Sequence, residues 1–290
     1  MTVEIAVVFG LLAGVGWGTG PIASKYAFQD GVSPIITGIT QSGIGVVALW
    51  CVAILIHGPR ILQQTSPSLI LPFVVTGVIA SAVGRYLLYY GIDTVGASIN
   101  SSLAATDPLF ATLIAVVALN EIPTTMELIG CVITVGGVVL VAGSNGGNDS
   151  DWKRRGVVIP LIAAGLYGAG AVIRRYGFGE GQIPPVFASA INETTALIAL
   201  SVGFFIAQPD IRDQLNIDQF RHLILTGVLY TSGTVSMFVA LNAGPVVIGT
   251  TLGSTAAVIS VIGSKLWLSD SETITPAIVV GSIVTVVGVI

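Results

Sequence analysis

Ten apolar stretches fill almost the whole chain and limit it to one class of fold. A hydrocarbon layer about 30 Å thick is crossed by a helix of about 20 apolar residues, and each stretch is long enough for one span. The runs are continuous rather than alternating, which predicts helices and not barrel strands. They lie at 4–27, 34–57, 69–92, 97–119, 124–143, 156–177, 184–207, 221–243, 245–268 and 273–290. The sequence therefore predicts an all-α integral membrane protein with ten transmembrane helices in a lipid bilayer, which we expect to be the cell membrane.

The composition excludes other classes of protein. Hydrophobic residues make up 53% of the chain and charged residues only 9%, whereas soluble domains contain about 25% charged residues. Lys and Arg number 11 against 15 Asp and Glu, so we expect no nucleic acid as partner. The two cysteines, Cys51 and Cys131, lie inside apolar stretches, far from a second thiol at metal-ligand spacing. We expect neither a metal nor a cofactor.

The second half of the chain repeats the first at a shift of 150 residues. At this shift Trp17 aligns with Tyr167 and Lys25 with Arg175. A polar stretch at 144–155 separates the two predicted domains, which are residues 1–143 and 156–290. Identical residues at this shift include Val7 and Val157, Gly18 and Gly168, Gly20 and Gly170, Tyr26 and Tyr176, Phe28 and Phe178, and Thr76 and Thr226.

Five helices in each half have a topological consequence. After an odd number of crossings the second half starts on the opposite side of the bilayer, so we expect two inverted five-helix repeats around a central cavity. Repeats of this kind are typical of transporters, which place a binding site near the midplane and expose it to each side in turn. A membrane scaffold enlarged by duplication is the alternative.

Each half resembles the EamA repeat of the drug/metabolite transporter superfamily. In the second copy Ala256 and Ala257 replace Asp107 and Pro108. The resemblance implies a carrier of amino acids, other metabolites or drugs, and the superfamily also contains sugar-phosphate and nucleotide-sugar carriers. It rests on Gly16 to Gly18, Leu87 to Thr94, Asp107 and Pro108, Asn120 and Glu121, and Gly130 to Leu140.

Arg85 and Glu193 stand inside predicted helices, where a charge costs several kcal/mol unless it is paired, solvated or functional. Their repeat equivalents are Val235 and Gly43, so the fold itself does not require these charges. Arg85 is a candidate for substrate binding, with snorkelling or a static ion pair as the alternatives. Burial disfavours the charged form of Glu193, which suits proton exchange. A permanent pair with Arg85 would oppose that exchange.

Asp107 precedes Pro108, which predicts a local break in the fourth helix. Its carboxylate is a candidate for binding a substrate amine or the Arg85 guanidinium, and a polar helix contact without a ligand is the alternative. Trp17 and Tyr167 are expected to line the cavity from equivalent positions. The complete predicted substrate-binding set is Trp17, Gln41, Arg85, Tyr89, Asn100, Asp107, Tyr167, Asn192, Glu193 and Tyr230.

Glycines mark the fifth and tenth stretches as closely packing helices. Gly130 and Gly137 align with Gly281 and Gly288 at a shift of 151 residues. Small residues let helix backbones approach closely within one chain, which is the favoured interpretation, or between two copies in a homodimer.

The orientation of the chain is ambiguous. With a cytoplasmic N-terminus the inner loops would carry only Arg60, Arg174 and Arg175, fewer basic residues than the outer side. The charge rule therefore favours an external N-terminus, whereas the family resemblance implies that both termini are inside.

The leading functional hypothesis is a secondary transporter that moves a small amphipathic metabolite, such as an amino acid, by alternating access, with or without coupling to protons. A sugar-phosphate or nucleotide-sugar exchanger is the alternative within the same class. An intramembrane enzyme is not expected, because the two histidines lie at helix ends and no His-Glu-x-x-His pattern occurs. A scaffold without transport activity is a further alternative.

Overall fold

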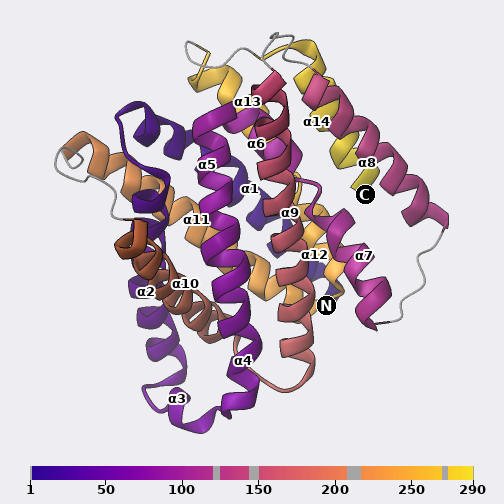
Figure 1. The fold of residues 1–290 in the computed structure, drawn as a ribbon. Coiled ribbons are helices and arrows are strands. Elements are labelled where there is room, and N and C mark those ends of the chain that lie inside the picture. The colour runs from indigo at the N-terminus through magenta and orange to yellow at the C-terminus, as the bar shows by residue number, and fades with distance from the viewer. Residues whose placement is uncertain (1, 120–124, 144–149, 208–216, 270–273, 290) are drawn as a thin grey trace.

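The computed structural model describes residues 2–119, 125–143, 150–207, 217–269 and 274–289, and every element within these ranges is a helix (Figure 1). The first half contains α1 (Thr2–Gln29), α2 (Pro34–His57), α3 (Ile61–Gln64), α4 (Pro67–Thr76), the π-helix η1 (Gly77–Gly84), α5 (Arg85–Val95), α6 (Ala97–Ala104), α7 (Asp107–Leu119) and α8 (Thr125–Gly143). The second half contains α9 (Ser150–Gly179), α10 (Pro185–Ala207), α11 (Ile217–Ala243), α12 (Val246–Gly253), α13 (Ala256–Trp267) and α14 (Pro276–Val289).

Prolines and glycines set several of the helix boundaries. Proline is the first residue of α2, α4, α10 and α14, where its missing N–H would have no partner in any case. Gly58 and Gly96 follow α2 and α5 with φ of +79° and +90°. Their backbone N–H groups donate to Ile54 and Ile92 and so close the last turns.

Helices cover most of the described residues in each of the ten predicted stretches. Seven helical runs in the described part of the chain are long and apolar enough to cross a membrane, which makes the chain a multi-pass membrane protein. The predicted stretches 124–143, 245–268 and 273–290 lie outside this set, so the count of ten spans stays a prediction. The seven runs are Val3–Gln29, Pro34–His57, Pro67–Val95, Ala97–Ala118, Val157–Gly179, Pro185–Ile206 and Gln219–Ala243.

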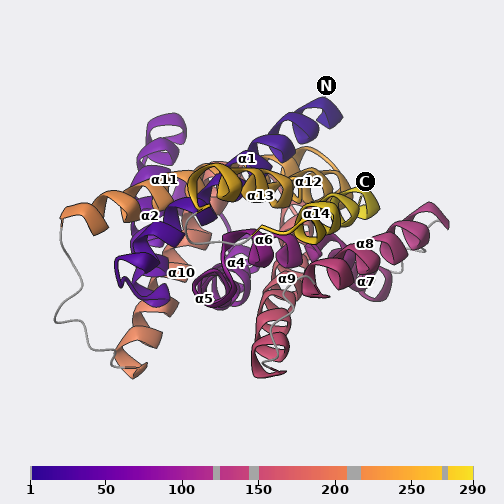
Figure 2. The same ribbon diagram turned by 90° about the horizontal axis from the view of Figure 1, so that it is seen from above.

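Helices of one half pack against helices of the other in a reciprocal pattern. The first helix of each half, α1 or α9, lies against the third helical run of the other half, which is α11 or α4–η1–α5. The two second helices, α2 and α10, contact each other, and so do the last helices, α8 and α14 (Figures 1 and 2). When two halves are related by a twofold axis, a contact between one helix of the first half and another of the second is repeated with the two halves exchanged.

Glycines bring α8 and α14 into backbone contact, as the sequence predicts for packing within one chain. A Cβ atom on Gly130 would lie 2.3 Å from the carbonyl oxygen of Gly288, and one on Gly137 would lie 2.7 Å from that of Gly281. Because Gly281 and Gly288 are the repeat equivalents of Gly130 and Gly137, the two contacts are symmetry mates. The close-packing face of each helix is therefore occupied within the chain.

The predicted break before Pro108 is present, since α6 ends at Ala104 and α7 begins at Asp107. The second half has a matching break between Gly253 and Ala256, although it contains no proline there. Proline therefore does not by itself explain the interruption, which belongs to the repeated fold.

The first helix of each half, α1 or α9, packs closely against the residues that follow a helix break in the other half. A Cβ atom on Gly18 would meet the Ala256 carbonyl and Ile259, at 2.9 and 2.6 Å. A Cβ atom on Gly168 would meet the Asp107 carbonyl and Phe110, at 2.7 and 2.9 Å. Glycine at both positions lets α1 and α9 approach the broken helices closely.

Candidate substrate-binding cavity

A cavity of about 80 Å³ lies where the two halves meet. The two helix breaks line it from equivalent positions, with Ala104, Ala105 and Asp107 on one side and Gly253, Ser254 and Ala256 on the other. A space of this size holds several waters or a small polar molecule.

Aromatic side chains form the apolar part of the lining. Trp17 on α1 and Tyr167 on α9 both line the cavity, as predicted from their equivalent positions, and Tyr230 on α11 joins them. Glycines make room for two of these rings. A Cβ atom on Gly20 would lie 2.5 Å from the Tyr230 ring, and one on Gly233 would lie 2.6 Å from the Trp17 ring.

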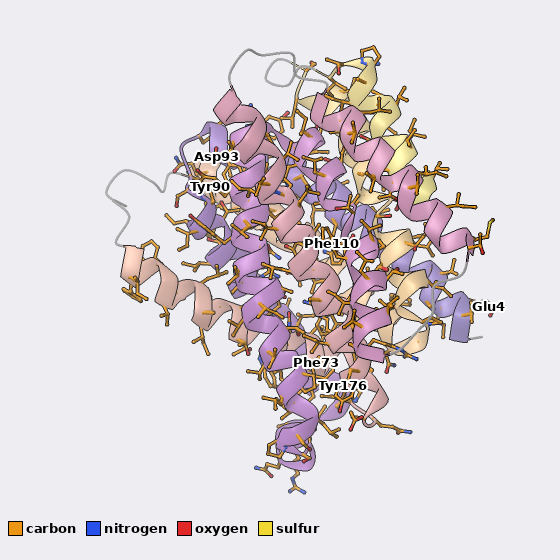
Figure 3. All side chains as sticks on the ribbon, turned by 45° about the vertical axis from the view of Figure 1, so that its right-hand side comes forward. Glu4, Phe73, Tyr90, Asp93, Phe110 and Tyr176 are labelled. Carbon is orange, nitrogen blue, oxygen red and sulfur yellow. The ribbon has the colours of Figure 1, made fainter. Side chains whose placement is uncertain are left out.

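A π-helix directly precedes Arg85, whose side chain is buried in the interior. The run α4–η1–α5 extends between Phe73 and Asp93, labelled near its opposite ends in Figure 3, and Arg85 lies between them. A π-turn shifts the residues after it around the helix axis and often occurs at functional sites. The equivalent stretch of α11 is an ordinary α-helix, so the two halves differ where the charge is placed.

Arg85 forms a two-point ion pair with Glu193 on α10. Its Nη1 donates to Glu193 Oε2 at 2.7 Å and to Ser42 Oγ at 2.6 Å, and its Nη2 donates to Glu193 Oε1 at 2.5 Å. Arg85 is 4% exposed and Glu193 is fully buried. The acidic partner of Arg85 is therefore Glu193 and not Asp107. Arg85 lines the cavity, whereas Glu193 lies behind it.

Two further hydrogen-bonded groups fix the lining from behind. The Tyr89 hydroxyl donates to Gln41 Oε1, and the Tyr89 ring meets Tyr230 edge-on at 5.4 Å between centroids. Ser81 Oγ donates to Asn192 Oδ1 at 2.6 Å, while Asn192 Nδ2 donates to Thr76 Oγ1 at 2.9 Å. Gln41 and Ser81 line the cavity, and their partners hold them in place.

The structure thus brings six of the ten predicted site residues to the cavity wall, namely Trp17, Gln41, Arg85, Asp107, Tyr167 and Tyr230. Tyr89, Asn192 and Glu193 lie behind the cavity wall, and each is hydrogen-bonded to a lining residue. Asn100 lies apart from both groups. It is fully buried on α6, and a Cβ atom on Gly91 would lie 2.0 Å from its Oδ1.

Arg174 is a lining residue that sequence reasoning missed. The sequence places it among the loop charges, but it lies inside α9 and is only 4% exposed. Its Nη2 donates to Ser81 Oγ at 3.1 Å, and its guanidinium carbon lies 5.0 Å from the centre of the Phe238 ring. Its spacing of seven residues from Tyr167, two helical turns on the same face, was the signal that pointed inward.

The described residues include no group of three or more His, Cys, Asp or Glu side chains that could hold a metal ion.

A cavity between two duplicated apolar helical halves, lined by interrupted helices and buried charges, is typical of transporters. The model of the EamA-like transporter family matches residues 4–143 and again 154–290. The chain belongs to this family and is a transporter of the drug/metabolite type.

Two further similarities agree with the duplication and the fold. An uncharacterized protein of Methanocaldococcus jannaschii is 26% identical over 142 residues, which cover 49% of this chain and 99% of that protein. That relative therefore matches only half of this chain over its own entire length. A solved crystal structure aligns with 98% of this chain and 94% of its own, with a TM-score of 0.72 and 18% identity. This likeness shows a shared fold.

Proposed function

We propose that this chain is a secondary carrier that moves a small amphipathic metabolite, such as an amino acid, by alternating access. The observation that carries the proposal is the meeting of two equivalent helix breaks on one cavity that also holds buried charges. Interrupted helices expose backbone groups and helix termini at membrane depth, where they bind polar ligands.

The proposal includes an inverted relation between the halves. Each half contains an odd number of predicted crossings, so the second half runs through the membrane in the opposite sense. The reciprocal contacts between α1 and α11, between α9 and α4–η1–α5, and between α8 and α14 support a twofold relation between the halves. The odd number of crossings is what places its axis in the membrane plane. Rocking of one half against the other would then open the cavity to each side in turn.

Within the proposal, the Arg85–Glu193 pair is the place where a proton could couple to transport. The pair joins the first half to the second, and both carboxylate oxygens are occupied by the guanidinium. A proton that binds Glu193 removes its charge and weakens the contact. Coupling through Glu193 therefore requires the two side chains to separate during the cycle.

An exchange assay tests the proposed function. The purified chain is reconstituted in liposomes loaded with an unlabelled amino acid, and uptake of the same labelled amino acid is measured for a panel of amino acids. We expect uptake above that of empty liposomes, and we expect Ala104→Trp to abolish it by filling the cavity. Val117→Trp is the matched control on α7, because Val117 is 82% exposed and does not line the cavity.

Two outcomes would contradict the proposal. Exchange of sugar phosphates without exchange of any amino acid would support the phosphate exchanger instead. Absence of exchange for every compound, in a preparation that is inserted and monodisperse, would favour a scaffold.

A further inference from the structure

Among the described residues, two arginines line the cavity, and only Arg85 is paired with a carboxylate. Arg85 has Glu193 on both of its terminal nitrogens. Within the described residues, no carboxylate oxygen lies within 4.0 Å of a nitrogen of Arg174.

The surroundings of Arg174 leave its charge largely uncompensated. Its polar contacts among the described residues are one hydrogen bond to Ser81 Oγ and the face of the Phe238 ring. Its Nε is buried and has no hydrogen-bond partner among the described residues. A buried cation without a counter-charge is costly, so the position favours a ligand that supplies one.

We propose that Arg174 is the anion-binding residue of the cavity and that it takes the carboxylate of the transported metabolite. This inference rests on the carrier function proposed above. The planar guanidinium fork matches a carboxylate at two points, and charge-assisted hydrogen bonds of this kind are stronger than neutral ones.

The hydrogen bonds around Arg174 orient it for this role. Ser81 uses its own proton toward Asn192 and so presents lone pairs to Arg174. Asn192 is anchored in turn by the Phe73 carbonyl and the Thr76 hydroxyl. The guanidinium is therefore held at Nη2 by a fixed acceptor and supported by the Phe238 ring, while Nη1 and the second proton of Nη2 are left for a ligand.

The charges on the cavity wall identify the rest of the ligand. Arg85 and Glu193 pair with each other, so Arg174 and Asp107 are the remaining basic and acidic side chains that line the cavity. The zwitterion that we propose places its carboxylate on Arg174 and its ammonium toward Asp107. A phosphate dianion would leave an excess of negative charge in a poorly solvated site. The ligand class is therefore an α-amino acid whose side chain meets Trp17 and Tyr167.

Binding measurements on the purified full-length chain test this assignment. The probes are alanine, leucine and phenylalanine, each with its decarboxylated amine and its deaminated acid, and inorganic phosphate. For the wild type we expect at least one amino acid to bind about ten-fold or more tightly than its amine, because a hydrogen-bonded charge contact is lost with the carboxylate. In Arg174→Gln we expect the amino acid and its amine to bind within about two-fold of each other.

Arg175→Gln is the matched control. Arg175 adjoins Arg174 but donates to the Leu241 carbonyl at 3.0 Å and does not line the cavity, so this variant should keep the wild-type preference. Arg174→Lys serves if the glutamine variant does not fold. It keeps the charge but loses the two-point contact, and the preference should shrink without vanishing.

Several results would overturn the inference while leaving the carrier function intact. An unchanged preference for the amino acid over its amine in folded Arg174→Gln would do so, and so would an unchanged preference in Arg174→Lys. Phosphate that binds more tightly than any amino acid, and only when Arg174 is present, would overturn the carboxylate assignment. If the wild type neither binds nor exchanges any amino acid, the proposed function fails as well.

Discussion

The guanidinium of Arg85 binds the carboxylate of Glu193 across the boundary between the two halves. The Nη1–Oε2 distance is 2.7 Å and the Nη2–Oε1 distance is 2.5 Å. Loss of one partner leaves the other charge buried, which costs about 3–5 kcal/mol, whereas apolar replacement of both is often close to neutral. We expect Arg85→Met and Glu193→Leu each to lower the midpoint of thermal unfolding strongly. The double variant should recover most of the loss, because Val235 already occupies the equivalent position as an apolar residue. Midpoints that fall additively in the double variant would contradict this prediction.

The α8–α14 contact predicts opposite effects for two adjacent glycines. A Cβ atom on Gly137 would lie 2.4 Å from Thr285 Oγ1 and 2.5 Å from the Thr285 backbone nitrogen, and backbone cannot yield cheaply. Gly136 has nothing within 4 Å of such an atom. We expect Gly137→Ala to lower thermal stability and Gly136→Ala to leave it unchanged or raise it by up to about 1 kcal/mol, because alanine favours helix. Unfolding midpoints in one detergent compare the pair directly, and equal effects would argue against this helix contact.

Asn100 and Gly91 predict a coupled pair of substitutions. The Asn100 amide has no hydrogen-bond partner among the described residues, and a Cβ atom on Gly91 would lie 2.0 Å from its Oδ1. We expect Gly91→Ala to destabilise the protein and Asn100→Ala to relieve the clash, so that the double variant is more stable than Gly91→Ala alone. Because Asn100 does not line the cavity, Asn100→Ala should retain amino acid exchange. Loss of exchange in a stable Asn100→Ala protein would show that Asn100 is needed for transport and would contradict this prediction.

Inversion of the two halves predicts that equivalent loops lie on opposite sides of the membrane. Gln29 and Gly179 are repeat equivalents at the ends of α1 and α9, and both are exposed. In a background with Cys51→Ser and Cys131→Ser, we expect Gln29→Cys and Gly179→Cys to react with an impermeant maleimide from opposite sides of oriented vesicles. Labelling of both from the same side would rule out the inverted arrangement. The side on which Gln29 reacts also decides the orientation that the loop charges left ambiguous.

Much of the architecture follows from sequence alone because it depends on local properties. Long apolar runs must satisfy their backbone groups internally and so become helices. The duplication is visible in aligned residues such as Trp17 and Tyr167, which do line one cavity. The proline ring predicts the break before Pro108, yet the matching break between Gly253 and Ala256 contains no proline, so the sequence signal is not required for it.

Only the tertiary structure decided which side chains meet. Arg85 is paired with Glu193, 108 residues away in the chain, and no local pattern distinguishes that carboxylate from Asp107 as its partner. Arg174 has the sequence signature of an interfacial charge near a helix end, but α9 runs on to Gly179 and packs so that Arg174 is buried against Ser81 and Phe238. The faces that helices turn toward each other depend on contacts between residues far apart in sequence. The periodicity of one helix shows which of its faces is apolar, but not which residues of another helix that face contacts.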